Sequence, residues 1–141
     1  MINRRIILKA GLVGTTAPVI LNTISAQAGE KAGLNGPLAG TVFFTSENPG
    51  RWAGKEKGHA PTIERTASNI EIVTGHEMRG FEHYIVKHQL LDENFQLVDE
   101  KLFDPDKDAP ITQHSLKGQS GQLYALSMCN LHDVWITGFK V

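Results

Sequence analysis

The feature that most constrains the fold is the stretch GQLYALSMCNLHDVW at residues 121–135, close to the C-terminus. Residues 123–128 are mostly apolar and follow Gly121, which is typical of a buried β-strand. The strand leads into Cys129 and then, three residues later, His132. A tight turn there brings a thiolate and an imidazole to one point, as a metal site requires. The alternative is an inert buried cysteine with a histidine nearby by chance, because free cysteine is commonly buried.

The rest of the chain is read as further short strands separated by turns. Residues 69–74 alternate apolar and polar side chains, as a half-buried strand does. Residues 46–58 are rich in turn formers and predict a loop, which Trp52 anchors to the body. The strand candidates are residues 41–45, 62–64, 69–74, 82–91, 95–103, 114–116, 123–128 and 134–141. About seven short strands without a long helix predict an all-β, antiparallel β-sandwich.

The composition limits the classes of function. The chain has 141 residues, a formal net charge of −1, 40% hydrophobic residues and 21% charged residues. These values are ordinary for one globular domain and give no electrostatic bias toward nucleic acid. The single cysteine excludes an internal disulfide. Any redox chemistry must therefore rest on one site, with electrons arriving from another molecule.

The N-terminal residues have the features of an export signal. Arg4 and Arg5 precede a modestly apolar run, and an A-x-A cleavage sequence ends at Ala28. The paired arginines favour twin-arginine export to the periplasm. A Sec signal or an uncleaved anchor is the alternative, although Pro18 and Asn22 interrupt the apolar run that an anchor needs. We expect a signal peptide at residues 1–28, a flexible leader at residues 29–40 and one domain at residues 41–141.

Three motifs resemble, in the same order, those of the superoxide reductases, the neelaredoxin and desulfoferrodoxin family. Residues 129–135 (CNLHDVW) are similar to the family's C-N-x-H-G-x-W segment. Residues 56–61 (EKGHAP) are similar to its E-K-H-V-P segment, and residues 76–85 (HEMRGFEHYI) to its second histidine segment. The resemblance implies an immunoglobulin-like β-sandwich of about seven strands that holds a mononuclear iron.

The resemblance also implies a ligand set of four histidines and one cysteine. His59, His76, His83 and His132 would lie in a plane about the iron, with Cys129 beneath it. The position opposite the sulfur would face solvent, and the implied activity is one-electron reduction of superoxide to hydrogen peroxide. A thiolate pushes electron density toward that position, and neutral imidazoles leave the iron site positively charged, which attracts a small anion.

The implied catalytic residues are Glu56 and Lys57. By resemblance, the lysine would steer superoxide and assist protonation, and the glutamate would occupy the open position of oxidised iron. The family has this pair directly before its first histidine, whereas here Gly58 separates Lys57 from His59. The added glycine changes the direction of the pair, so Lys55 is an alternative cation for the same role.

Two further departures from the family pattern concern spacing and charge. The interval from His76 to His83 is one residue longer than in the family, and Gly80 gives the turn the freedom to accommodate it. Asp133 replaces the glycine that follows the last histidine in the family. Its carboxylate would either repel an anion or cap the turn.

The other two histidines, His88 and His114, match no motif and are interpreted as structural or surface residues. Alternation along residues 82–91 places His83 and Ile85 on one face of a strand and His88 on the other. These assignments give His88 and His114 no part in the metal site.

The implied partners are superoxide and an external electron donor, such as a rubredoxin-like or cytochrome-type protein. One cysteine excludes the four-cysteine rubredoxin-like centre of longer desulfoferrodoxins, and a homo-oligomer is left open. A copper electron carrier is one alternative, but it needs a methionine after the histidine, and Met128 precedes Cys129. A zinc protein is another, although zinc prefers four ligands. A third is a family member that uses its iron only for binding or electron transfer.

Overall fold

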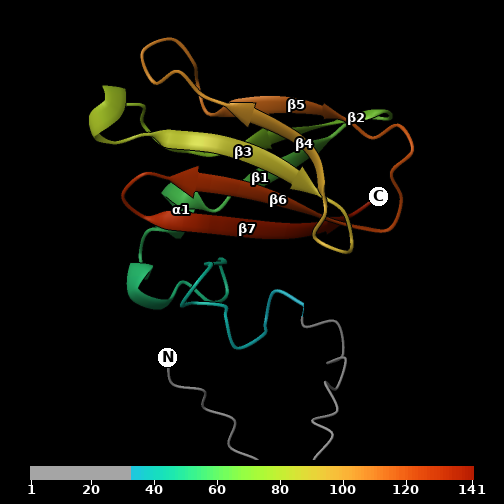
Figure 1. The fold of residues 1–141 in the computed structure, drawn as a ribbon, viewed down its shortest axis with the longest axis horizontal. Coiled ribbons are helices and arrows are strands. Elements are labelled where there is room, and N and C mark those ends of the chain that lie inside the picture. The colour runs from blue at the N-terminus through green and yellow to red at the C-terminus, as the bar shows by residue number, and fades with distance from the viewer. Residues whose placement is uncertain (1–32) are drawn as a thin grey trace, which may run out of the picture. The chain divides into compact units, whose positions relative to one another are not determined.

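Seven strands form two antiparallel sheets in the computed structural model, which describes residues 33–141 (Figure 1). The strand order is β1-β2-β5 in one sheet and β4-β3-β6-β7 in the other. The strands are β1 Thr62–Arg65, β2 Asn69–Val73, β3 Ile85–Leu91, β4 Leu97–Leu102, β5 Ile111–Ser115, β6 Gln122–Cys129 and β7 Asp133–Lys140. The helical segments of the described chain are short: η1 Gly50–Trp52, α1 Glu56–His59 and η2 Gly80–Glu82. The predicted all-β sandwich is confirmed.

The signal peptide predicted at residues 1–28, and the start of the leader, lie outside the described residues. Between residues 33 and 141, none of the helices has the length and apolar character needed to span a membrane.

Strand β6 lies between β3 and β7 and carries four buried side chains on its inner face. Successive side chains of a strand point to opposite faces, so Leu123, Ala125, Ser127 and Cys129 share one face. Each of the four is at most 2% exposed. Along this face the side chains change from apolar (Leu123 and Ala125) to a hydroxyl (Ser127) and then to a thiol (Cys129).

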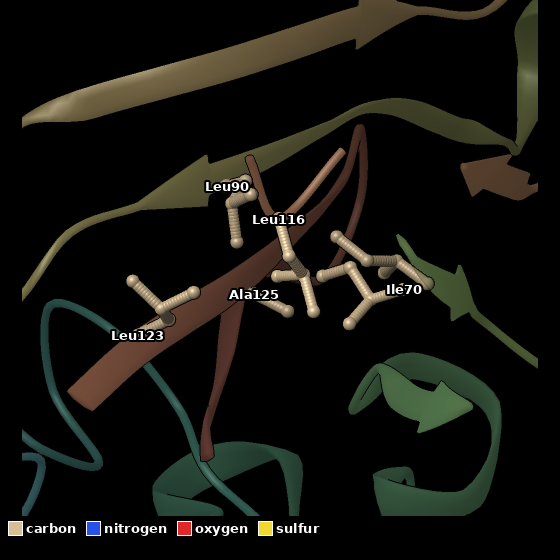
Figure 2. Close-up of a cluster of buried hydrophobic side chains, with 6 residues drawn as sticks. Ile70, Leu90, Leu116, Leu123 and Ala125 are labelled. Carbon is tan, nitrogen blue, oxygen red and sulfur yellow. The ribbon is translucent and has the colours of Figure 1, made fainter. Parts of the chain in front are cut away.

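The apolar half of that face belongs to the core between the two sheets. Figure 2 shows Leu123 and Ala125 of β6 beside Ile70 of β2, Leu90 of β3 and Leu116, which follows β5. All five are at most 9% exposed. Burial of a large aliphatic side chain contributes about 1.5–3 kcal/mol, so this core fixes the register of β6 and the place of its C-terminal end.

The outer face of the four-stranded sheet is covered as well. Tyr124 and Leu126 of β6 and Ile136 of β7 form a buried cluster, and Leu34 and Phe43 pack against it. Strand β6 is thus apolar on both faces along most of its length, which explains its nearly continuous apolar sequence.

The prediction of a strand at residues 41–45 is wrong. Phe44 alone bonds to β7, where its N–H donates to the carbonyl of Val134 and its carbonyl accepts from the N–H of Ile136, each at 2.9 Å. The N–H groups of residues 41–43 point instead to the carbonyl of Leu38. The two adjacent phenylalanines suggested a strand, but this turn leaves only one residue to pair with β7.

Strand β3 differs from the prediction in its start and its faces. It begins at Ile85, because residues 80–82 form η2. A register shift between Ile85 and Lys87 then interrupts the alternation. Ile85 and His88 are consequently both fully buried, although a regular strand would place them on opposite faces.

Candidate metal centre

Four histidines and the cysteine meet at one end of the sandwich, beside the turn that joins β6 to β7 (left in Figure 1). Their five ligand atoms all lie within 4.8 Å of one another. His59 ends α1, His83 follows η2 and Cys129 ends β6, while His76 and His132 lie in the connections after β2 and before β7. The five residues named from the resemblance are therefore brought together from across the chain.

The four ring nitrogens are spaced as ligands of one ion would be. Nε2 of His59 lies 3.0 Å from Nδ1 of His132, which lies 3.1 Å from Nε2 of His83. Nε2 of His83 lies 3.0 Å from Nε2 of His76. Two ligands at right angles, each about 2.1 Å from a first-row metal, are about 3.0 Å apart. With Sγ of Cys129 at 3.5 Å from Nδ1 of His132, the donor set fits one metal ion.

Backbone carbonyls fix which nitrogen of two histidines faces the group. Nδ1 of His59 donates to the carbonyl of Lys55 at 2.9 Å, and Nδ1 of His76 donates to that of Glu77 at 2.5 Å. Each bond leaves the Nε2 lone pair free to bind a metal, as is usual for histidine ligands.

Burial sets the charge state of the group. It is the largest cause that lowers the pKa of His76 to about 4, and it also lowers the pKa of His59, His83 and His132. These rings are neutral at pH 7, which is the form that binds metals. Burial raises the pKa of the Cys129 thiol, whereas a bound cation would favour its thiolate.

The side chain of Asn130 holds together two segments that carry ligands. Its Oδ1 accepts from the N–H of Tyr84 at 2.9 Å, and its Nδ2 donates to the carbonyl of Glu82 at 3.0 Å. The residues it clamps flank His83, whereas Asn130 itself lies between Cys129 and His132 in the chain. The sequence analysis matched Asn130 to the motif but gave it no role, and its match to the asparagine of that motif was the available signal.

The carboxylate of Asp133 is bound to two residues of η1. Its carboxylate accepts from Nε1 of Trp52 at 2.9 Å and forms an ion pair with Arg51, which is the main cause of its lowered pKa. Its φ of 61° lies in the left-handed region, which explains why the family uses glycine there. Of the two predicted roles, capping fits this geometry, because the carboxylate ties the turn to η1.

Residues 46–58, which were predicted as a loop, include η1 and most of α1, and Trp52 anchors this segment as predicted. Its ring contacts that of Phe44 and meets that of His132 edge-on, with centroids 4.7 Å apart. On the other side of this turn, Nε1 of Trp135 donates to the carbonyl of His132 at 2.9 Å. Two tryptophans thus fix the orientation of this ligand.

Glu56 and Lys57 do not join the metal group. Both line a hollow together with Ser46, Pro61 and other residues, none of them from that group. Glu56 Oε1 accepts from the N–H of Gly54 at 3.0 Å, which holds it at the start of α1. Of the lysines, Lys55 is the one whose positive charge acts on His59, His83, His132 and Cys129, and Arg79 acts more strongly than Lys55 on His83.

Three residues lie outside the metal group for clear reasons. His88 and His114 are 0% and 3% exposed and are held in a separate buried network of hydrogen bonds, so both are structural rather than surface residues. Met128 packs with the cluster on the outer face of β6, opposite Cys129, so it is no candidate for a copper ligand.

Solved structures of superoxide reductases are similar to this chain. A variant of the superoxide reductase (neelaredoxin) from Ignicoccus hospitalis is 26% identical, with a TM-score of 0.64 over 72% of this chain and 94% of that one. The superoxide reductase from Treponema pallidum is 28% identical, with a TM-score of 0.51 over 60% and 67%. The enzyme from Giardia intestinalis, at 20% identity and a TM-score of 0.53 over 61% and 100%, shares the fold.

The family model described as desulfoferrodoxin matches residues 51–138, which is more than half of the chain and includes all five residues of the metal group. A search of curated protein sequences found no match. The chain belongs to the desulfoferrodoxin family.

Proposed function

We propose that this protein is a superoxide reductase, in which superoxide, one electron and two protons give hydrogen peroxide. The observation that carries the proposal is the group of four ring nitrogens and one sulfur within 4.8 Å, in a chain of the desulfoferrodoxin family. The structural neighbours named as superoxide reductases support it.

The family binds a mononuclear iron, and the donor set of this chain suits that metal. Imidazole and thiolate are both good ligands of iron, and bound iron would supply the single electron that superoxide accepts. We assign His59, His76, His83 and His132 as the nitrogen ligands and Cys129 as the thiolate. Because four neutral rings and one thiolate do not cancel two positive charges, the site would attract an anion.

We assign the steering of superoxide to Lys55. Its charge acts on four of the five proposed ligands, and its own carbonyl holds the ring of His59. Lys57 and Glu56, which the motif alone favoured, stay a prediction without a contact to the metal group. A cation next to the site raises the local concentration of a small anion, so its effect is on the rate of encounter.

We expect the electron to come from another molecule, because the single cysteine cannot form a second redox centre of thiolates. We propose a rubredoxin-like or cytochrome-type donor, with the protons coming from solvent. Homo-oligomerisation is compatible with this scheme, and no nucleic acid is required.

The stoichiometry of the reaction tests the proposal. The iron-loaded, reduced protein is mixed with superoxide, and hydrogen peroxide, oxygen and iron oxidation are measured together. Reduction predicts one peroxide for each superoxide and each iron oxidised, without oxygen release. Release of oxygen would indicate dismutation. Tight iron binding without oxidation by superoxide would favour the alternative, a family member that only binds iron or transfers electrons.

We also propose that residues 1–28 direct twin-arginine export to the periplasm, with cleavage near Ala28. The test is fractionation of cells that produce the full chain or its Arg4→Lys, Arg5→Lys double variant. The double variant should remain in the cytoplasm. Export of the double variant equal to that of the wild type would instead indicate the Sec route.

A further inference from the structure

A chain of hydrogen bonds between buried side chains crosses the interior of the sandwich next to the metal group. It begins at Ser127, ends at the exposed carboxylate of Asp99, and its internal members are at most 6% exposed. In order, it comprises Ser127, Thr74, His88, Thr112, His114 and Asp99.

Within this network of hydrogen bonds, Thr74 lies near the metal group and is bonded to two other members, Ser127 and His88. Its hydroxyl is hydrogen-bonded to Oγ of Ser127 and to Nε2 of His88, each at 2.8 Å. The other ring nitrogen of His88, Nδ1, is hydrogen-bonded to the hydroxyl of Thr112 at 3.0 Å. Burial and His114 lower the pKa of His88 to about 4, so the ring of His88 is neutral at pH 7.

These bonds connect the two sheets. Thr74 follows β2 of the three-stranded sheet, whereas Ser127 and His88 belong to β6 and β3 of the other, where they are paired residues. The backbone of Thr74 is also held, since its N–H donates to the carbonyl of Pro110 at 3.0 Å. The side chain of Thr74 is thus bonded to the four-stranded sheet, whereas its backbone is bonded to Pro110, directly before β5 of the three-stranded sheet.

The two ends of the Thr74–Ser127 bond lie close to two proposed ligands. The carbonyl of Thr74 accepts from the N–H of His76 at 2.8 Å, which fixes the start of the segment that carries this ligand. Ser127 shares the inner face of β6 with Cys129, two residues further on. The same bond therefore ties the segment of His76 to the strand of Cys129, whose side chains approach to 3.9 Å.

Stability alone does not require a polar connection here. A pair of apolar side chains of the same shape could fill the space at similar stability, whereas a buried hydroxyl that loses its partner is destabilising. In the described part of the chain, every buried side-chain nitrogen or oxygen has a partner. What the hydrogen bonds add is direction, because they are satisfied in only one relative position of the two sheets.

We propose that Thr74 is a positioning residue for the metal centre, and that its bonds to Ser127 and His88 set the place of His76 relative to Cys129. The proposal rests on metal binding by the five residues and is independent of superoxide turnover.

Binding of Co²⁺ to the full-length, metal-free chain tests the proposal. The absorption band from thiolate to cobalt reports binding at Cys129, and competition with a chelator gives the dissociation constant. Thr74→Val keeps the shape of the side chain and removes its hydroxyl, so we expect the dissociation constant to rise about ten-fold or more. Thr74→Ser keeps the hydroxyl and should restore binding.

Thr112→Val is the matched control. It removes the same group from the same network, including a bond to His88, but Thr112 lies in β5 away from every proposed ligand. Both valine variants should lower the midpoint of thermal unfolding, whereas only Thr74→Val should weaken Co²⁺ binding beyond about three-fold. If Thr74→Val fails to fold, Ser127→Ala removes the same bond with a smaller change and should weaken binding likewise.

Equal weakening by the two valine variants, or unchanged binding in folded Thr74→Val, would overturn the positioning role and leave the proposed function intact. Absence of Co²⁺ binding by the wild type would overturn the metal centre itself, and with it both proposals.

Discussion

Replacing Asn130 by alanine should weaken both the fold and the metal centre. The change removes the acceptor of the Tyr84 N–H and the donor to the Glu82 carbonyl, at 2.9 and 3.0 Å. A third bond, from Nδ2 to the carbonyl of Phe81, is long at 3.4 Å and adds little. The perturbation is therefore the loss of two good hydrogen bonds between the β6–β7 turn and the segment before β3.

The expected size follows from their number and exposure. A hydrogen bond contributes about 0.5–1.5 kcal/mol, and Asn130 is exposed, so the lower half of that range applies and the total is about 1–2 kcal/mol. One kcal/mol corresponds to about 4–8 °C in the unfolding midpoint of a domain near this size. We expect a decrease of about 4–16 °C in the metal-free protein. Because the same bonds hold the residues on both sides of His83, Co²⁺ affinity should also fall about ten-fold.

Differential scanning calorimetry and chelator competition measure the two effects. Asn94→Ala is the control, since Asn94 lies between β3 and β4 and its hydrogen bonds to Asp92 and Gln96 use backbone atoms, which alanine retains. It should change the free energy of unfolding by less than about 0.5 kcal/mol. A folded Asn130→Ala protein with lower stability but unchanged Co²⁺ affinity would refute the claim that this side chain holds the ligands in place.

Three further outcomes are expected. Lys55→Met should slow the reaction of the reduced protein with superoxide by about ten-fold and reduce its dependence on ionic strength, as measured by pulse radiolysis, whereas an equal effect of Lys57→Met would contradict the assignment. Cys129→Ser should remove the thiolate-to-iron absorption band, and survival of the band would exclude sulfur ligation. The pKa of His88 is about 4 in the folded protein and 6.5 ordinarily, so the unfolded chain binds the extra proton first. This contribution to the free energy of unfolding is complete above about pH 6.5 and is lost as the pH falls toward 4. The midpoint of thermal unfolding should therefore decrease less over this pH range in His88→Gln than in the wild type.

The parts of the fold that the sequence predicted are those with a clear period or an apolar run. Strands β2, β6 and β7 lie within a residue or two of their predicted positions, because burial on one or both faces determines which residues appear there. The strand at residues 41–45 failed because β-propensity does not report whether the backbone has a partner. Only tertiary structure shows that Phe44 alone bonds to β7.

The histidines divide along similar lines. The ligand candidates were predicted by resemblance, because each lies in a short motif that can be recognised without knowing the structure of the loops between the motifs. The burial of His88 was not predictable from alternation, since the register shift after Ile85 moved it to the inner side. Lys55 and Lys57 are two positions apart in the chain, and the sequence did not show that Lys55 precedes α1 whereas Lys57 lies within it.

The burial of Cys129 has a consequence for the chemistry of a lone thiol. It is 2% exposed and packs with Ile85, Phe103 and Met78. A thiol in such a place cannot reach the sulfur of a second copy, because a disulfide needs the two Cα atoms within about 7 Å. Even in oxidising surroundings the chain would stay unlinked, and its sulfur would stay available to a metal.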